Sequence, residues 1–399
     1  MTTNLKNNLI IKNLYLKHFL QDGSCEAEYL GNKLRVFGGI EEEIVDVEVI
    51  GKDIDLICNV VNIVKHSSYR IKNKCIYFLE CSGCQLQHIS YEKQLEIKKQ
   101  FVVKELEEID GNILKKIHNV VPSDKQFNYR NHARFSVSKS KKYLGNSGFI
   151  NRWTKKLVNI EKCEIMNQKI NDKKSQLKGH LEGMSQYSVR VSVKGDSFLI
   201  QPKFNDLNII TGQKNYYEKF NNKKIQISSP SFFQVNIEQA EKMGEIITEI
   251  CSLHGNEIIL DAFSGVGTFS LLLSEKVKKI YAIESSYSSV EDAKINLDNS
   301  KNVELIQNEV ENLKEYKFKE NIDIVILDPS RKGVHFNALN WVLNLSPSQI
   351  IYVSCNVSSL KKDIRILGTS YEIDKIIPLD MFPQTKHVEC IVNLIKVKN

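Results

Sequence analysis

The feature that most constrains the fold is a glycine-containing stretch at residues 258–270. Three apolar residues end in Asp261, and a short segment with Gly265 and Gly267 leads into the apolar run 269–273. This pattern is typical of a strand, a tight turn and a helix. Because glycines let the backbone pass close to a ligand and a helix start offers free N–H groups, the stretch predicts a ligand-binding turn. The alternative is a plain turn with structural glycines.

A second apolar run, residues 279–284, ends in Glu284. An acid at the tip of the second strand, roughly 20 residues past the glycines, commonly holds ribose hydroxyls. The spacing Asp261-x-x-x-Gly265-x-Gly267 differs from the Gly-x-Gly-x-x-Gly spacing that accommodates a pyrophosphate. The pattern therefore favours S-adenosylmethionine (SAM) over NAD.

Strand and helix patterns alternate over the rest of the C-terminal half, which predicts a mostly parallel, doubly wound α/β sheet. The expected strands lie near residues 257–262, 279–284, 302–307, 322–328, 349–354, 371–379 and 387–397. Ligands of such sheets bind at the carboxyl ends of the strands. Three of these ends carry reactive or polar groups, namely Asp328, Cys355, and the pair His387 and Glu389.

Gln234 lies just before Asn236, which we expect to cap a helix with Ala240, Met243, Ile247 and Ile250 on one face. The amide of Gln234 is either a ligand-facing group or a surface side chain.

The N-terminal 66 residues contain short strand patterns at 24–29, 33–37 and 43–50, separated by glycine turns. Such spacing predicts a small barrel of the size of oligonucleotide-binding domains, or else a structural β-appendage. Farther along, residues 126–137 interleave basic and aromatic side chains. This segment reads as an extended strand that offers phosphate contacts and a stacking surface, or simply a solvated face.

Three cysteines fall within ten residues, at Cys75, Cys81 and Cys84, in the motif that ends Gln-Leu-Gln-His88. A Cys-x-x-Cys turn points two thiolates at one metal or cluster, and Cys163 is the best candidate for a fourth ligand. From spacing alone zinc is the simpler inference, and the identity of the metal stays open. A helix from residue 91 to about 109 follows, with an apolar face that packs.

At 399 residues the chain should hold two or three domains, and 42% hydrophobic residues suffice for sizeable cores. A net charge of +7 is compatible with a nucleic-acid partner. The sequence shows no signal peptide, lipidation motif or membrane-spanning run, so we expect a cytoplasmic protein without a membrane partner. In that setting we expect the nine cysteines to act as metal ligands, nucleophiles or core residues rather than to form disulfides.

Taken together, these motifs resemble the SAM-dependent RNA uracil-5-methyltransferases, especially the iron–sulfur-containing branch that acts on 23S rRNA. The likeness runs essentially from end to end. It covers the N-terminal barrel, the four-cysteine pattern, Ser-Phe-Phe-Gln234, Asp-x-Phe263-Ser-Gly-Val-Gly, Asp328-Pro-x-Arg-Lys-Gly, Ser-Cys355-Asn and Phe-Pro-x-Thr-x-His-Val-Glu389.

The resemblance implies a multidomain chain. Residues 1–66 would form a small OB-like TRAM barrel that binds RNA, and residues 67–225 a central α+β domain with the iron–sulfur cysteines. Residues 226–399 would form an α/β Rossmann-like SAM methyltransferase domain. The partner would be RNA, with 23S rRNA preferred over tRNA, and the chain would act as a monomer.

The resemblance also implies roles for individual residues. Cys355 would be the nucleophile and Glu389 the base. The SAM contacts would be Gln234, Phe263, Thr268, Glu284 and Asp328. A 4Fe–4S cluster would be ligated by Cys75, Cys81, Cys84 and Cys163.

The sequence departs from the family pattern at three positions. Ser82 replaces a common Gly, Ser330 the usual Pro after Asp-Pro, and Val357 the usual Pro after Ser-Cys-Asn. None of them removes a reacting atom, so they concern loop geometry. Three alternatives stay open at this point. They are the same reaction on the T-loop uridine of tRNA, a non-catalytic RNA-binding or ribosome-assembly protein, and an amino-methyltransferase.

Overall fold

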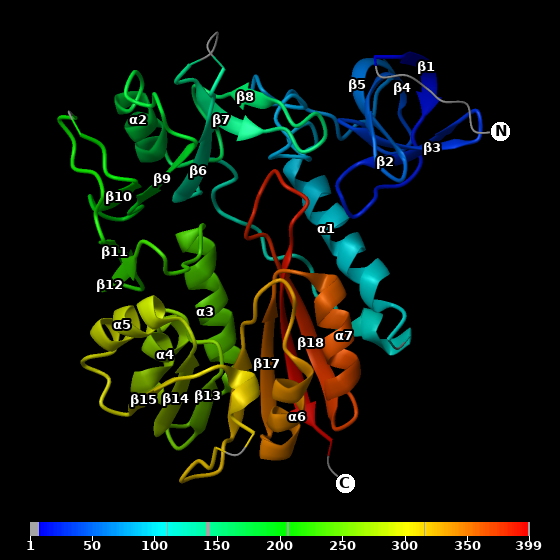
Figure 1. The fold of residues 1–399 in the computed structure, drawn as a ribbon. Coiled ribbons are helices and arrows are strands. Elements are labelled where there is room, and N and C mark those ends of the chain that lie inside the picture. The colour runs from blue at the N-terminus through cyan, green and yellow to red at the C-terminus, as the bar shows by residue number, and fades with distance from the viewer. Residues whose placement is uncertain (1–7, 110, 141–143, 206, 315, 398–399) are drawn as a thin grey trace. The chain divides into compact units, whose positions relative to one another are not determined.

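The computed structural model describes residues 8–109, 111–140, 144–205, 207–314 and 316–397 (Figure 1). The chain divides into two compact units. Unit 1 consists of Met1–Phe101, Lys125–Val189 and Phe382–Lys386, and unit 2 of Val102–Asp124, Arg190–Met381 and His387–Asn399. The boundaries proposed from the sequence, 66/67 and 225/226, stay predictions.

Unit 1 begins with a five-stranded sheet in the order β1-β4-β5-β3-β2 (Figure 1). Its strands are β1 (Ile10–Tyr15), β2 (Cys25–Tyr29), β3 (Asn32–Phe37), β4 (Ile44–Lys52) and β5 (Leu56–Lys65). β3 and β5 are parallel, and the other pairs are antiparallel. The segment after β1 pairs with β2, since Lys17 N–H donates to Glu26 O at 2.8 Å. Alternate residues Val45, Val47 and Val49 point into one apolar core. The strands expected at 24–29, 33–37 and 43–50 are thus present.

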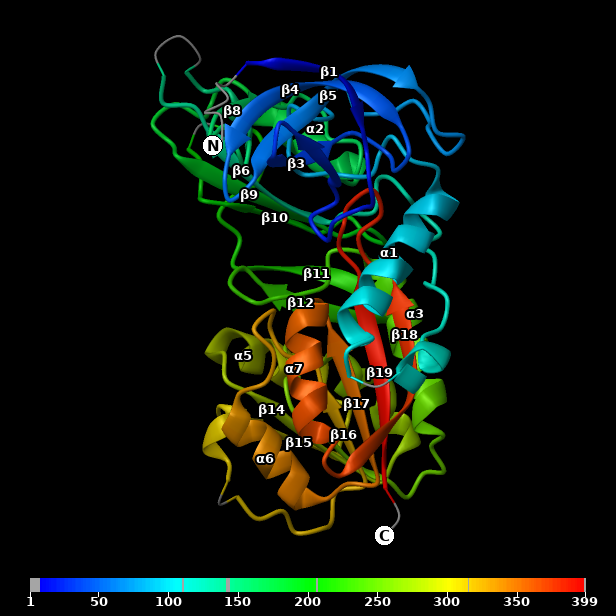
Figure 2. The same ribbon diagram turned by 90° about the vertical axis from the view of Figure 1, so that its right-hand side faces the viewer.

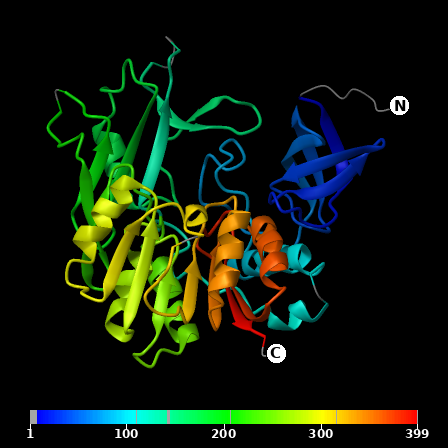
Figure 3. The same ribbon diagram turned by 60° about the horizontal axis from the view of Figure 1, so that its bottom comes forward.

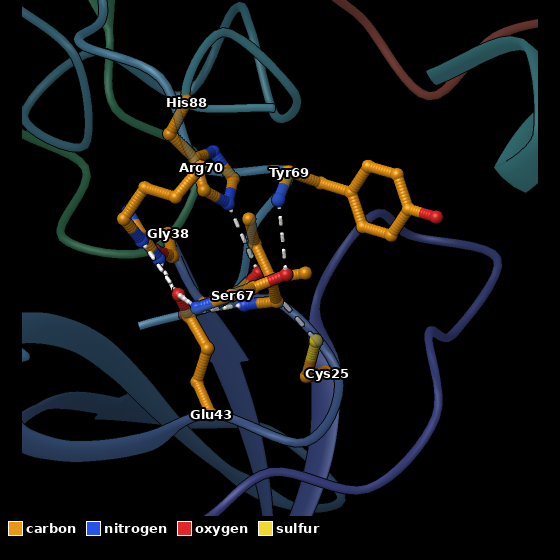
Figure 4. Close-up of polar contacts among 9 residues, drawn as sticks. Cys25, Gly38, Glu43, Ser67, Tyr69, Arg70 and His88 are labelled. Carbon is orange, nitrogen blue, oxygen red and sulfur yellow. Dashed lines mark hydrogen bonds and ion pairs between the residues drawn. The ribbon is translucent and has the colours of Figure 1, made fainter. Parts of the chain in front are cut away.

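An ion pair ties the next segment to this sheet (Figure 4). The guanidinium of Arg70 donates to both carboxylate oxygens of buried Glu43, at 2.7 and 2.5 Å, and to Gly38 O at 2.8 Å. The ring of His88, the last residue of the cysteine motif, lies 2.9 Å from Gly39 O. Burial alone would raise the pKa of Glu43, but hydrogen bonds from Arg70 and from backbone N–H groups lower it overall.

The rest of unit 1 contains β6 (His132–Val137), β7 (Ser147–Ile150), β8 (Leu157–Asn159) and α2 (Gln168–Gln176). β6 and β7 are antiparallel, as are β7 and β8. The chain passes from unit 1 to unit 2 within α1 (Tyr91–Leu106) and again within β9 (Gln186–Val191). The helix expected from 91 to 109 is present but three residues shorter.

The interpretation of residues 126–137 as one extended strand with a stacking surface is wrong. Regular strand structure begins at His132, because Asn128 has a φ of 56° and turns the chain. Tyr129 is buried and its hydroxyl donates to Pro383 O at 3.1 Å, so its ring cannot stack on a base. Arg134 remains exposed.

Unit 2 is built on a seven-stranded sheet in the order β15-β14-β13-β16-β17-β19-β18. Its strands are β13 (Ile258–Asp261), β14 (Lys279–Glu284), β15 (Val303–Gln307), β16 (Ile324–Leu327), β17 (Gln349–Ser354), β18 (Tyr371–Leu379) and β19 (Glu389–Lys396). The first five are parallel, and β19 is antiparallel to both its neighbours. The strand order reverses between β13 and β16, which is where such sheets bind ligands.

Helices cover both faces of this sheet (Figures 2 and 3). They are α3 (Ile237–Cys251), α4 (Thr268–Leu273), α5 (Tyr287–Asn296), α6 (Phe336–Leu345) and α7 (Val357–Leu367). One core joins α6 and α7 to alternate strand residues such as Leu260, Val325 and Tyr352. The predicted doubly wound sheet is confirmed.

Shorter elements complete the described part of unit 2. They are η1 (Gly111–Lys116), β10 (Phe198–Gln201), β11 (Asn215–Phe220), β12 (Lys223–Ser228), η3 (Ser274–Lys276) and η4 (Val310–Asn312). Asn236 caps α3 as expected, since its side chain accepts a hydrogen bond from Gln239 N–H. Among the described residues, no helix combines the length and apolar character needed to cross a bilayer.

Candidate active site

The glycine stretch forms the expected strand, turn and helix. β13 ends at Asp261, and Gly265 and Gly267 have φ of 55° and 88°, a conformation that favours glycine. A side chain at Gly267 would also meet Leu297 Cδ1 at 2.9 Å. The backbone of this loop is therefore set by its glycines, and Thr268 begins α4.

Two polar atoms of this turn are buried without a hydrogen-bond partner in the described protein, Asp261 Oδ1 and Ser264 Oγ. The other carboxylate oxygen of Asp261 accepts from Ser270 N–H and Oγ–H at 3.2 and 2.7 Å. Burial raises the pKa of Asp261 to about 6. Buried polar atoms normally have hydrogen-bond partners. These two atoms without a partner therefore fit a loop that completes its hydrogen bonds with a ligand.

Glu284 joins the same loop from the next strand. Its carboxylate accepts from Gly265 N–H at 3.0 Å and from Ser286 N–H at 2.6 Å. Phe263, Thr268 and Glu284 are each half-buried around this turn. The structure thus brings Glu284 and the glycine loop together as the sequence predicted.

Gln234 is half-buried on the loop between β12 and α3. That loop is held by Asp292 of α5, whose buried carboxylate accepts from Ser228 N–H, Ser228 Oγ–H and Ser231 Oγ–H at 2.6 to 2.7 Å. Sequence reasoning missed Asp292. Nothing in the local sequence marks it, because its partners lie about 60 residues earlier in the chain.

Cys355 and Glu389 meet through strand pairing. The antiparallel register of β17 and β19 ends with Ser354 opposite Cys390, and Cys355 follows β17 directly while Glu389 is the first residue of β19. Glu389 is 3% exposed and Cys355 is half-buried. The two residues predicted as nucleophile and base thus lie at adjacent strand ends, where the charge of Glu389 acts on the Cys355 thiol.

The charged groups around the Cys355 thiol shift its pKa in opposite directions. The pKa of Cys355 is raised to about 11, mainly by burial and also by the charges of Glu389 and Asp328, while Arg331 opposes the rise. Burial also raises the pKa of Glu389 well above its ordinary value, with Asp328 adding to the rise and Arg331 opposing it. Arg331 is therefore the positive group that favours the ionised form of both residues.

Asp328 follows β16 directly and is half-buried between the two halves of the site. Its pKa is raised to about 7, mainly by burial and also by the charge of Asp261. Asp328 also acts on both Cys355 and Glu389. It is thus the group that links the glycine turn to the thiol.

At Ser330 and Val357, where the sequence departs from the family pattern, hydrogen bonds hold both loops. Gly333 N–H donates to Ser330 O at 2.9 Å. Val357 is the first residue of α7, where proline is also common, and Asn356 caps the helix through Ser358 N–H. A helix start needs no proline when its cap is present.

The four predicted metal ligands Cys75, Cys81, Cys84 and Cys163 all line one cavity of about 350 Å³ in unit 1. Burial raises the pKa of each thiol, to about 11 for Cys163, and the negative charges of neighbouring cysteines raise those of Cys84 and Cys163 further. In the part of the chain that the structure describes, no three His, Cys, Asp or Glu side chains are grouped closely enough to hold a metal ion.

Residues 205–397 match the family model of tRNA (uracil-5-)-methyltransferases. An uncharacterized RNA methyltransferase of Clostridium acetobutylicum is 30% identical over 399 residues, covering 84% of this chain and 86% of the relative. One of Bacillus cereus is 29% identical, covering 100% and 99%.

Among solved structures, the tRNA (uracil-54, C5)-methyltransferase of Pyrococcus abyssi in complex with S-adenosyl-L-homocysteine has the same fold. Its TM-score is 0.75 at 23% identity, covering 96% of this chain and 100% of that one. The C-terminal half therefore has a Rossmann-like SAM methyltransferase fold. The chain belongs to the RNA methyltransferases, and its C-terminal half matches the model of the tRNA (uracil-5-)-methyltransferases. It is an enzyme of the class that uses SAM and acts on RNA.

Proposed function

We propose that this protein transfers a methyl group from SAM to C5 of a specific uridine through a covalent adduct between Cys355 and C6 of the uracil. The observation that carries the proposal is the pairing of Cys355 with Glu389 on the strand ends beside Asp328 and the glycine turn.

SAM supplies an electrophilic methyl group when it is bound. Gln234, Phe263, Thr268, Glu284 and Asp328 are the side chains that would hold it. The unpaired atoms Asp261 Oδ1 and Ser264 Oγ and the glycine backbone of the turn support this placement. Glu284 is already hydrogen-bonded to the turn, in the position suited to ribose hydroxyls.

Uracil C5 is a poor nucleophile, so the protein must activate it. Addition of the Cys355 thiolate to C6 forms an S–C6 bond and makes C5 enolate-like, so that C5 can accept the methyl group. The Glu389 carboxylate then takes the C5 proton, the C5–C6 double bond re-forms and the thiolate leaves. Arg331 favours the ionised form of both groups. An uracil stacked in RNA cannot reach them, so the target must be unpaired or flipped out.

The adduct is the most direct test. RNA that carries 5-fluorouridine at the target has no C5 proton to lose, so the covalent complex should accumulate and survive denaturing electrophoresis. Cys355→Ala should abolish the adduct while SAM binding persists. Full methylation by Cys355→Ala would remove Cys355 from the mechanism. This outcome, or a product methylated on an exocyclic amine, would favour the alternatives without a nucleophilic cysteine.

We propose 23S rRNA as the target, because by family resemblance the bacterial tRNA enzymes generally lack both the N-terminal barrel and the cysteine set. The strand order β1-β4-β5-β3-β2 with a parallel β3–β5 pair supports an OB-like TRAM barrel that binds RNA. The second candidate target is the T-loop uridine of tRNA. The Pyrococcus tRNA enzyme favours it, since that structure covers 96% of this chain.

Release of tritium from 5-³H-uridine separates the two targets. Unmodified 23S rRNA and unmodified tRNA should be offered to the enzyme with SAM in parallel. Release from rRNA alone supports the first target, and release from tRNA alone overturns it. Mapping 5-methyluridine in rRNA from cells with and without the gene would then locate the site.

We also propose that Cys75, Cys81, Cys84 and Cys163 hold a 4Fe–4S cluster. Four thiolates on one Zn²⁺, each about 2.3 Å from the metal, would lie within about 4 Å of each other. Among the described residues no such compact group is found, and the four cysteines line one cavity of about 350 Å³. The choice of a 4Fe–4S cluster over a single zinc ion rests on the family resemblance.

We assign the cluster a structural role in RNA docking. Anaerobically prepared protein should be brown and contain about four iron atoms per chain. Cys81→Ser should lose the iron and weaken RNA binding more than SAM binding. A colourless protein with stoichiometric zinc would exclude the cluster, and a greater loss of SAM affinity would exclude the docking role.

A further inference from the structure

A shallow cleft in unit 1 lies outside the residues to which the methyl-transfer mechanism assigns a role, and two of the proposed cluster ligands, Cys81 and Cys84, are among its lining residues. Its lining comes from the N-terminal sheet, from the loop that carries the cysteine motif, from the loop after β7 and from Lys386. The lining residues that carry the argument are Phe37, Ser82, Gln85, Arg152, Trp153 and Lys386.

The loop after β7 presents a tryptophan and a cation together. The ring centroids of Trp153 and Phe37 are 5.8 Å apart, and the Arg152 guanidinium lies 4.9 Å from the Trp153 ring centroid. Asn151 closes the loop, since its side chain accepts from Trp153 N–H at 2.8 Å and donates to Glu80 O at 2.7 Å. Ser82 Oγ accepts from Arg152 N–H at 2.9 Å. The half-buried Trp153 ring is therefore held in place from two sides.

The opposite wall is fixed by Gln85, a residue of the cysteine motif. Its side-chain oxygen accepts from Lys386 N–H at 3.2 Å, and its side-chain N–H donates to Ser82 O at 2.7 Å. Gly23 allows the sheet to press against this wall, because a side chain there would meet Gln85 Cβ at 2.7 Å. The cleft is thus built by hydrogen bonds and close packing.

The size and charge of the cleft restrict its occupant. Its volume of about 40 Å³ has room for a few water molecules but for no whole base, so a base can contact Trp153 only at the rim. Arg152, Lys155 and Lys156 are exposed around Trp153. An anionic ligand with a flat ring that stacks on Trp153 matches both observations.

We infer that the rim of this cleft binds an unpaired nucleotide of the substrate RNA, whose base stacks on the accessible part of Trp153 and whose phosphate contacts Arg152. The nucleotide differs from the target uridine, because neither Cys355 nor Glu389 is among the residues that line the cleft. The inference rests on RNA as the substrate of the family. It is independent of the catalytic roles proposed for Cys355 and Glu389.

Tryptophan fluorescence tests the stack directly. Of the chain's two tryptophans, Trp341 is buried in unit 2, so the difference between the full-length wild type and Trp153→Phe reports on Trp153. Titration with a mixed-sequence single-stranded RNA of about 12 nucleotides should quench Trp153. A fully paired duplex of the same length should not, because its bases are already stacked.

Affinity for the single strand supplies the second readout. Trp153→Ala should weaken binding about 5- to 150-fold, the effect of removing one base–aromatic stack. Trp153→Phe should stay within a few-fold of wild type, and SAM affinity should not change. Arg152→Ala should weaken binding and reduce its salt dependence, while its backbone bond to Ser82 can persist.

An unchanged Trp153 signal at saturating single-stranded RNA, or Trp153→Ala within twofold of wild type, would overturn the inference. If Trp153→Ala misfolds, the wild-type fluorescence titration decides alone. The binding assay needs no methyl transfer and can be repeated in Cys355→Ala. Failure of the stack is therefore distinguishable from failure of the proposed catalytic mechanism.

Discussion

The side-chain amide of Asn356 donates a hydrogen bond to the backbone oxygen of Arg331 at 3.0 Å. This contact joins the residue after Cys355 to the loop that carries Arg331, whose charge lowers the pKa of both Cys355 and Glu389. The Arg331 side chain also lies 3.5 Å from His387 Nδ1. Asn356 is thus a positioning residue that holds Arg331 near the thiol.

Substitution of Asn356 should slow the reaction without affecting SAM binding. Asn356→Ser retains an N-cap acceptor for α7 but is too short to reach the Arg331 carbonyl. We expect a 10- to 100-fold lower rate of adduct formation with 5-fluorouridine RNA, on the order of 1.4–2.7 kcal/mol. The melting temperature should change little. A rate equal to that of wild type would show that the loop needs no such tether.

Arg331 should set the pH dependence of methylation. The reaction needs Cys355 and Glu389 in their ionised forms, and both pKa values are raised in the folded protein. Activity should therefore increase with pH above neutrality, and Arg331→Ala should shift the profile to higher pH because a positive charge is lost. Lys332→Ala, the neighbouring exposed cation, is the control. Identical profiles for Arg331→Ala and wild type would contradict the assignment.

Asp292 should control SAM affinity through the Gln234 loop. Its buried carboxylate holds Ser228 and Ser231, so Asp292→Asn should loosen the loop by removing charge-assisted acceptors. We expect a SAM dissociation constant about tenfold higher and a lower melting temperature. Asp298→Asn, at an exposed position just after α5, should leave both unchanged. The SAM dissociation constants are measured by calorimetric titration. Equal constants for Asp292→Asn and wild type would show that Asp292 does not support the cofactor site.

The Glu43–Arg70 pair should make a large contribution to stability. Arg70→Ala leaves the buried Glu43 carboxylate without its partner, which typically costs about 3–5 kcal/mol. Arg35→Ala, which breaks a more exposed pair with Asp55, should cost about 1 kcal/mol or less. Urea denaturation with two-state analysis of unit 1 signals measures both. If Arg70→Ala and Arg35→Ala lowered the free energy of unfolding equally, the buried pair would contribute no more to stability than the more exposed one.

The same pair predicts an acid-dependent stability. The pKa of Glu43 is lower in the folded protein than in the unfolded chain, so its contribution is complete above the unfolded pKa. That contribution is lost as pH falls through the lower, folded pKa. Glu43→Gln should flatten this part of the stability curve between about pH 5 and pH 3. If the free energy of unfolding depended on pH in the same way for wild type and Glu43→Gln, the prediction would be wrong.

The sequence could predict much of unit 2 because its signals are local. The strand limits of β14, β17 and β18 agree with their apolar runs, and Asn236 caps α3 as its position suggests. Prediction failed at Tyr129, where an interleaved basic and aromatic pattern looked exposed. A local pattern does not show that another segment, here Pro383, covers the ring.

By itself, then, the sequence determined the elements of the doubly wound sheet, the glycine turn and the identity of the groups at the strand ends. Only the tertiary structure decided which groups meet. The antiparallel pairing of β17 and β19 brings Cys355 and Glu389 to adjacent strand ends, and contacts across tens of residues hold Arg331 and the Gln234 loop. The physical reason is that strand register and buried hydrogen bonds depend on partners distant in the chain, which periodicity and turn residues do not encode.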